Sequence, residues 1–182
     1  MTIAGLSRSK IVAAVSSANL EFRPGQAKLF KWVEEEQVPL LIFSAGLGDV
    51  LEEAVKQRSE EPLPSTCTVI SNRMQFDENG DLVGFTGQSF HVFNKHAASA
   101  IDSPYFSSDD VKARHNVLLL GDSLGDPNMS QGIGARETLK IGFLNDKVEE
   151  RMGAYMQVYD AVILGDGGLD FALEILNQVA TK

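Results

Sequence analysis

Three apolar runs that each end in small or polar residues constrain the fold of this chain most strongly. They are VPLLIFSAG at 38–46, HNVLLLGDS at 115–123 and DAVILGDGG at 160–168. A run that is apolar on both faces is typical of a strand covered on both sides, as the strands of parallel sheets are. Helical spacing follows the first run at 47–57 and the third run up to Ala180. Strands that alternate with helices predict an α/β fold with a mainly parallel sheet.

Weaker patterns complete this prediction. The pair Asn79-Gly80 joins two extended runs and is a strong hairpin signal. Helical spacing predicts helices at 6–15, 24–37 and 148–158, and a further short strand is predicted at 139–145.

Composition narrows the classes of function. The chain has 182 residues, the length of one domain, and 25 acidic against 16 basic residues give it a net charge of −9. Nucleic acids and anionic membranes require a basic surface, so small molecules or metal-bound phosphates are the expected partners. No apolar run approaches the roughly 18 residues of a membrane span. The single cysteine, Cys67, cannot form an internal disulfide, is expected to be buried, and suits a reducing cytosol.

The carboxyl ends of parallel strands bind ligands in such sheets, so the loops after the apolar runs hold the candidate site. Ser44 and the amides of Ala45 and Gly46 precede a predicted helix and can hold phosphate oxygens. Lys95 supplies a cation for negative charge that develops during a reaction. Each residue alone also has a structural explanation, and the ordered set favours a phosphate site.

The motif GDSLGD at 121–126 supports two chemistries. Its carboxylates, Asp122 and Asp126, can bind Mg²⁺, which proteins often hold through one or two carboxylates together with phosphate and water. Ser123 stands in the letters Gly-Asp-Ser-Leu of a serine-esterase family, and such a nucleophile needs a histidine base. All three histidines precede Ser123, whereas that family has its base downstream. The order of residues therefore favours the carboxylates.

Longer stretches carry a specific resemblance from about residue 10 onward. They are PLLIFSAGLGDVLEEAVKQ, VISNRMQFDENGDLVGFTGQSFHVFNKH, NVLLLGDSLGD and LKIGFLNDKVEERMGAYMQVYDAVI. They are similar to the cytosolic 5'-nucleotidase III family, the pyrimidine and 7-methylguanosine-phosphate nucleotidases, which are haloacid dehalogenase-like phosphohydrolases.

The resemblance implies Mg²⁺-dependent hydrolysis of a nucleoside 5'-monophosphate in the cytosol. It implies that Ser44 and Ala45 contact the phosphate, that Lys95 stabilises the phosphoryl group, that Asp122 binds Mg²⁺ and that Asp126 supports the site. It also implies an incomplete Rossmann-like haloacid dehalogenase-type core at 23–182, with a mainly parallel sheet and a small hairpin. Residues 1–22 resemble only the end of a helical cap.

One departure from the family affects its chemistry directly. The family's nucleophile and general acid are two aspartates with one residue between them (Asp-x-Asp), and no two aspartates of this chain have that spacing. We therefore expect little or no turnover by the chain as printed, since positioning residues cannot replace a nucleophile. We also expect exposed sheet edges that favour association. The alternative is a non-catalytic relative that pairs with a partner or binds nucleotide weakly.

Overall fold

The structure is a computed structural model, and it describes residues 5–86, 90, 103–131 and 133–180. The chain forms two compact units, each described here by itself. The first comprises Met1–Phe22 and Gln26–His91, and the second comprises Arg23–Gly25 and Val92–Lys182. Among the described residues, no helix has the length and apolar character needed to cross a membrane.

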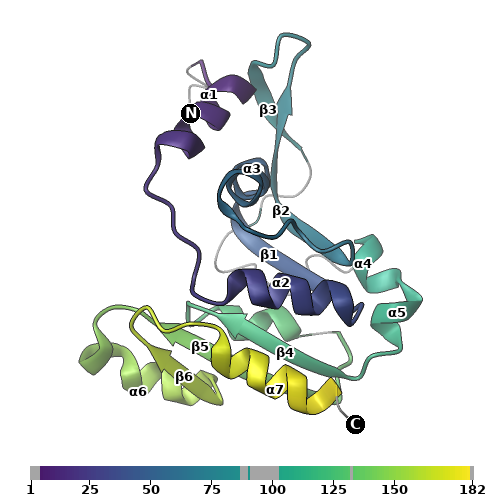
Figure 1. The fold of residues 1–182 in the computed structure, drawn as a ribbon, viewed down its shortest axis with the longest axis vertical. Coiled ribbons are helices and arrows are strands. Elements are labelled where there is room, and N and C mark those ends of the chain that lie inside the picture. Colours follow the sequence, from purple (N-terminus) through teal and green to yellow (C-terminus); the bar gives the residue numbers. More distant parts are fainter. Residues whose placement is uncertain (1–4, 87–89, 91–102, 132, 181–182) are drawn as a thin grey trace. The chain divides into compact units, whose positions relative to one another are not determined.

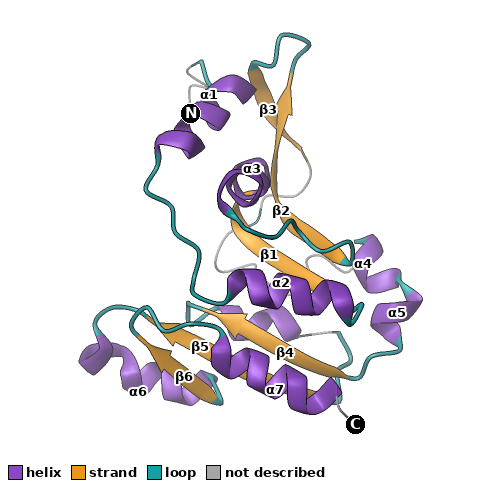
Figure 2. Ribbon diagram, viewed as in Figure 1, coloured by secondary structure: helices purple, strands orange, loops and turns teal. Residues whose placement is uncertain are grey.

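The first unit is a three-stranded sheet with helices (Figures 1 and 2). Its elements are α1 (Arg8–Ser17), α2 (Gln26–Glu35), β1 (Leu40–Leu47), α3 (Gly48–Arg58), β2 (Cys67–Phe76) and β3 (Leu82–Thr86). The strand order is β1-β2-β3, with β1 parallel to β2 and β2 antiparallel to β3. The predicted hairpin is therefore confirmed. Gly80 takes the φ of +82° that its turn requires.

Local sequence explains how α1 joins this unit. The side chain of Ser7 caps the helix by accepting a hydrogen bond from the amide of Lys10. Ile11 and Val15 then lie on one face and form a buried cluster with Met74 of β2. Figure 1 shows α1 close to α3 and to the hairpin of β2 and β3.

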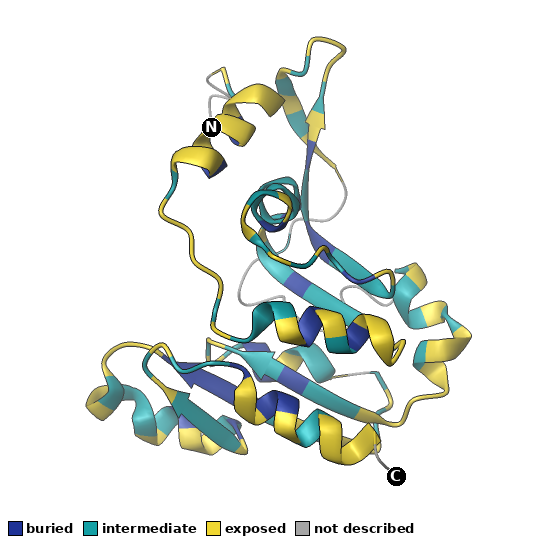
Figure 3. Cartoon of the chain, viewed as in Figure 1, coloured by how far each residue is buried: buried dark blue, intermediate teal, exposed yellow. Residues whose placement is uncertain are grey.

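The second unit holds a fully parallel sheet in the order β4-β5-β6. Its elements are α4 (Pro104–Ser107), α5 (Asp109–Lys112), β4 (Asn116–Gly121), the 3-10 helix η2 (Asp126–Ser130), β5 (Glu137–Leu144), α6 (Val148–Val158), β6 (Ala161–Leu164) and α7 (Asp170–Ala180). The central strand β5 contains the buried side chains of Ile141, Phe143 and Leu144 (Figure 3). The mixed α/β architecture with parallel pairing agrees with the predicted fold class.

Each parallel pair has one strand with a single partner. Among the described residues, β1 pairs only with β2 and β4 pairs only with β5. Neither β1 nor β4 contains a charged residue. Edge strands usually carry charges, prolines or bulges that discourage further pairing. A bulge between Phe43 and Leu47 interrupts β1, whereas β4 keeps a regular register with β5.

Some predictions need adjustment against the structure. Cys67 is half-buried because it is the first residue of β2 and lies at the end of the sheet. The prediction that Cys67 is buried is therefore wrong. Contacts group residues 1–22 with 26–91, and the predicted boundary between a cap remnant at 1–22 and a core at 23–182 stays a prediction. The short helices α4, α5 and η2 were not predicted.

Candidate functional site

The first candidate loop lies within the last part of β1. Ser44, Ala45 and Gly46 follow the buried Phe43, and the strand's register with β2 shifts there. The amide of Gly46 donates a hydrogen bond of 3.0 Å to the hydroxyl of Ser44. Helix α3 begins two residues later at Gly48, and the side chain before it does not cap its amides. Helix N-terminal amides without a side-chain cap favour an anion, so this end of β1 suits a phosphate group.

Asn72 of β2 fixes this loop to a second segment. Its side-chain amide donates hydrogen bonds to the carbonyls of Ala45 and Phe90, at 2.8 and 2.9 Å. Its side-chain carbonyl accepts one of 2.8 Å from the amide of Phe90. The rings of Phe43 and Phe90 meet edge to face, 5.3 Å apart. Lys95, five residues beyond Phe90, lies outside the described residues.

Sequence reasoning missed Asn72, although a signal was present. Asparagine is rare in strands, and Asn72 stands in β2 shortly after the apolar residues Val69 and Ile70. A polar residue at such a place indicates that its side chain satisfies backbone groups of a neighbouring loop.

The second candidate loop connects β4 to η2. One carboxylate oxygen of Asp126 accepts hydrogen bonds from the amides of Asp122 and Ser123, at 2.9 and 3.0 Å. Asp126 is only 3% exposed. Because this oxygen is engaged with the backbone, Asp126 shapes the loop, and the role expected for it in supporting a phosphate site stays a prediction.

Two tyrosines satisfy the carbonyls of the same loop. Tyr155 of α6 donates a hydrogen bond of 2.6 Å to the carbonyl of Asp122. Tyr159, which directly follows α6, donates one of 2.5 Å to the carbonyl of Ser123. Burial, with the charge of Asp126 next, raises the pKa of Tyr159 well above its usual range. Burial and then the charge of Asp122 raise the pKa of Tyr155. Both hydroxyls therefore stay protonated and able to donate.

The carboxylate of Asp122 is exposed and makes no hydrogen bond or ion pair with the described residues. The described part of the chain contains no cluster of three or more histidine, cysteine, aspartate or glutamate side chains that would enclose a metal. A single free carboxylate does fit Mg²⁺, because this ion keeps several waters and often takes its other oxygens from a phosphate.

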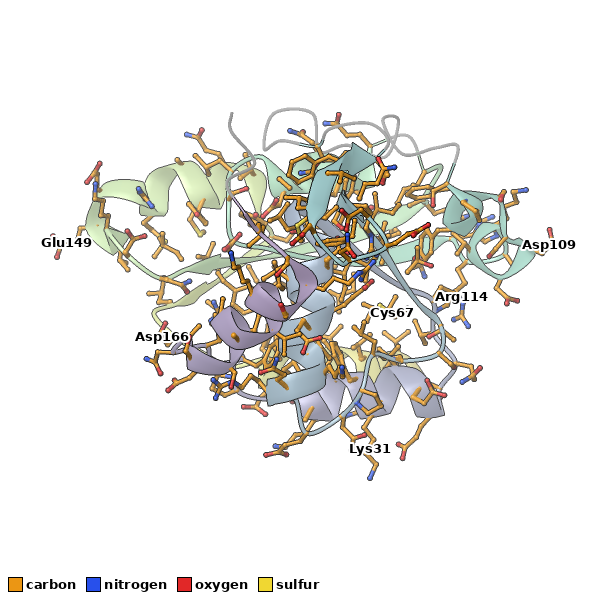
Figure 4. All side chains as sticks on the ribbon, turned by 90° about the horizontal axis from the view of Figure 1, so that it is seen from above. Lys31, Cys67, Asp109, Arg114, Glu149 and Asp166 are labelled. Atoms are coloured by element: carbon orange, nitrogen blue, oxygen red, sulfur yellow. The ribbon has the colours of Figure 1, made fainter. Side chains whose placement is uncertain are left out.

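The third loop, Gly165–Gly167, follows β6. Arg23 donates hydrogen bonds to the carbonyl of Gly167 at 2.6 Å and to the side-chain carbonyl of Asn145 at 2.9 Å. Its guanidinium lies 4.1 Å from the centre of the Phe143 ring. Asp166, labelled in Figure 4, is exposed. Arg23, in the segment before α2, therefore holds the third loop in place.

The structure also bears on the serine-esterase alternative. His115 directly precedes β4 and Ser123 follows it, so the strand separates the two side chains. The six residues of β4 rise about 3.3 Å each, which places roughly 20 Å between its ends. His115 therefore cannot act as the base for Ser123. The other histidines, His91 and His96, lie outside the described residues.

Comparisons with known proteins show the family to which the chain belongs. A family model for pyrimidine 5'-nucleotidase (UMPH-1) matches residues 1–180. The 7-methylguanosine phosphate-specific 5'-nucleotidase A of Xenopus laevis is 42% identical over 178 residues, which cover 97% of this chain and 60% of the relative. The 7-methylguanosine phosphate-specific 5'-nucleotidase of Homo sapiens is 40% identical over 175 residues, which cover 96% of this chain and 57% of the relative.

Solved structures show the same relationship. The crystal structure of cytosolic 5'-nucleotidase IIIB bound to cytidine matches with a TM-score of 0.85 and 31% identity, covering 97% of this chain and 58% of that one. A phosphoserine phosphohydrolase-like protein from Francisella tularensis matches with a TM-score of 0.55 and 13% identity, which shows a likeness of fold alone. The chain spans about 60% of the length of the curated relative from Xenopus laevis. On the match to residues 1–180, this chain belongs to the pyrimidine 5'-nucleotidase (UMPH-1) family.

Proposed function

We propose that this chain binds the phosphate of a nucleoside 5'-monophosphate together with Mg²⁺, as part of a 5'-nucleotidase site that converts the nucleotide and water to nucleoside and phosphate. The observation that carries the proposal is the free carboxylate of Asp122. It projects from a loop whose amides and carbonyls are held by Asp126, Tyr155 and Tyr159. A ligand presented from an ordered loop binds a metal with less loss of conformational entropy.

The roles of the residues follow from their chemistry. Ser44 offers a hydroxyl to the phosphate, and the amides of Ala45 and Gly46 offer further donors beside the start of α3. Lys95 contributes a positive charge toward the phosphoryl oxygens. Asp122 supplies an oxygen ligand for Mg²⁺ and Asp126 holds the Asp122 loop. When bound, Mg²⁺ would neutralise negative charge on the phosphate.

We also propose that the chain as printed binds nucleotide without turning it over. Phosphoryl transfer through a covalent intermediate requires a nucleophile in line with the leaving group. The printed sequence contains no pair of aspartates with one residue between them. The reducing cytosol is the proposed compartment, which is consistent with the single cysteine and with the name of a relative from Caenorhabditis elegans, putative cytosolic 5'-nucleotidase 3.

Calorimetry and a phosphate-release assay test these proposals together. CMP, UMP and 7-methyl-GMP are titrated into the chain with and without Mg²⁺, and phosphate release is measured on the same samples, with Asp122→Asn as the matched control. We expect Mg²⁺-dependent binding that the substitution abolishes, and no release. A folded sample that binds none of the three nucleotides refutes the proposed function. Release that Asp122→Asn abolishes refutes the proposed inactivity and indicates another nucleophile.

The uncharged edge of β4 favours a second candidate, a binding role through association. We propose that a second copy of this chain pairs along β4, because those of its backbone groups that do not bond to β5 point away from that strand and its residues carry no charge. Sedimentation velocity over a range of concentrations is expected to show dimers. Leu118→Lys, in the middle of the edge, should yield monomers, while Val179→Lys, exposed near the end of α7, should not. Monomers of the unmodified chain at every concentration rule this role out.

A further inference from the structure

Two glycines on neighbouring strands make room for one aromatic ring. Gly121 of β4 and Gly142 of β5 are register partners in the parallel sheet. A Cβ atom at Gly121 would lie 2.7 Å from the Tyr159 hydroxyl oxygen, and one at Gly142 would lie 2.6 Å from a carbon of its ring. Ordinary carbon contacts are about 3.5–4.0 Å. The glycine pair is therefore the floor of a slot that Tyr159 fills.

The slot places a stacked pair of tyrosines beside the Asp122 loop. The rings of Tyr155 and Tyr159 stack with centroids 5.6 Å apart and an angle of 26° between their planes. Each residue is only 4% exposed. Their hydroxyls reach two successive carbonyls of the loop, those of Asp122 and Ser123. The stack thus fixes both donors relative to the sheet.

These hydrogen bonds complete the restraint of the loop backbone. The amides of Asp122 and Ser123 donate to Asp126, and their carbonyls accept from the tyrosines. With all four backbone groups held, the direction in which the Asp122 side chain leaves the loop is defined, while its carboxylate stays free. A ligand held this way needs no rearrangement when it binds a cation.

We infer that Tyr155 and Tyr159 are positioning residues for the metal-binding carboxylate of Asp122. The inference rests on the proposed function, because it assigns the tyrosines a role in Mg²⁺ binding. A purely structural role would use the same hydrogen bonds to stabilise the second unit, and it would leave the affinity for metal unchanged.

Electron paramagnetic resonance of Mn²⁺, used in place of Mg²⁺, separates these roles without relying on activity. Titration of the full 182-residue chain with Mn²⁺ measures the affinity from the signal of the free ion. Tyr155→Phe, Tyr159→Phe and the double variant remove the hydroxyls and keep the rings. Tyr105→Phe is the matched control, because the third tyrosine lies in α4 and pairs with Phe106 instead.

We expect Asp122→Asn to abolish Mn²⁺ binding, and the double variant to lower the affinity by about tenfold, as loss of groups that orient metal ligands commonly does. Tyr105→Phe should match the unmodified chain. If the unmodified chain binds no Mn²⁺, or Asp122→Asn binds it equally well, the proposed function fails. If binding depends on Asp122 but the tyrosine variants, shown to be folded by circular dichroism, keep full affinity, the positioning role is overturned. The single variants provide the same test where the double variant does not fold.

Discussion

Gly142→Ala tests whether Tyr159 fills a slot that only glycine provides. The strand cannot shift to make room, because Gly142 is paired on one side with Gly121 and on the other with Val162. The new methyl group would stand 2.6, 2.7 and 3.0 Å from three carbons of the Tyr159 ring. The ring must therefore move by close to 1 Å to restore ordinary contacts of about 3.5 Å. This displacement breaks the hydrogen bond from Tyr159 to the carbonyl of Ser123.

The expected loss follows from these two effects. Overpacking of a filled site costs about 1–3 kcal/mol, and a lost intramolecular hydrogen bond costs about 1 kcal/mol. Replacement of a strand glycine by alanine restores about 0.5–1 kcal/mol, because alanine loses less chain entropy on folding. We therefore expect Gly142→Ala to lower the free energy of unfolding by about 2 kcal/mol.

Urea unfolding followed by circular dichroism measures this change as a shift in the midpoint at constant slope. Gly153→Ala is the matched control. Gly153 lies in α6 with no atom near its missing Cβ, so this change should stabilise the chain by about 0.5–1 kcal/mol. In a Tyr159→Ala background the methyl group at 142 meets no ring, so the substitution should stabilise the chain by about 0.5–1 kcal/mol. A Gly142→Ala chain as stable as the unmodified one, or an equal cost in both backgrounds, would refute the slot.

Three further outcomes are expected. The raised pKa of Tyr159 means that its contribution to stability is complete below pH 10 and is lost as the pH rises further. The free energy of unfolding should therefore fall less steeply with pH above 10 in Tyr159→Phe than in the unmodified chain. The same pH dependence in both proteins would contradict this. Burial, with the nearby Glu52 charge, raises the pKa of the Cys67 thiol to about 11, so Ellman's reagent at pH 8 should react slowly until urea unfolds the chain. Asp126→Ala leaves two loop amides without their acceptor and should cost about 3 kcal/mol in urea unfolding, whereas Asp166→Ala, at an exposed position, should change stability by less than about 0.5 kcal/mol.

Strong local patterns explain which parts of the fold could be predicted. The helix expected at 148–158 is α6 with the same bounds, and the turn at Asn79-Gly80 joins β2 and β3 as expected. Apolar periodicity indicates the helix and the Asn-Gly pair indicates the turn, and both signals lie within about ten residues. The pairing of the parallel strands was not predictable in this way, because the register of β4 with β5 depends on packing between residues about twenty positions apart. The short helices α4 and α5 depend on caps by Ser103 and Ser108 instead of apolar periodicity.

The candidate site also contains residues that local patterns indicate and residues that they do not. Motif letters indicated Asp122 and Asp126, since carboxylates after a buried strand have an evident chemistry. Asn72 and the two tyrosines act on backbone groups that lie 18 to 36 residues away in sequence, and no local pattern identifies such partners. Two weak signals did exist, an asparagine in a strand and tyrosines four residues apart around the end of α6.

The placement of Arg23, Pro24 and Gly25 has a consequence for how the chain can be divided. Pro24 accepts a hydrogen bond from the amide of Leu169, and Arg23 holds the loops after β5 and β6, while the residues on both sides of this tripeptide belong to the first unit. The second unit is therefore discontinuous in sequence. A cut after His91 would release a C-terminal piece that lacks Arg23, so the second unit cannot be produced intact as a polypeptide that begins after His91, whereas residues 1–91 contain the whole first unit.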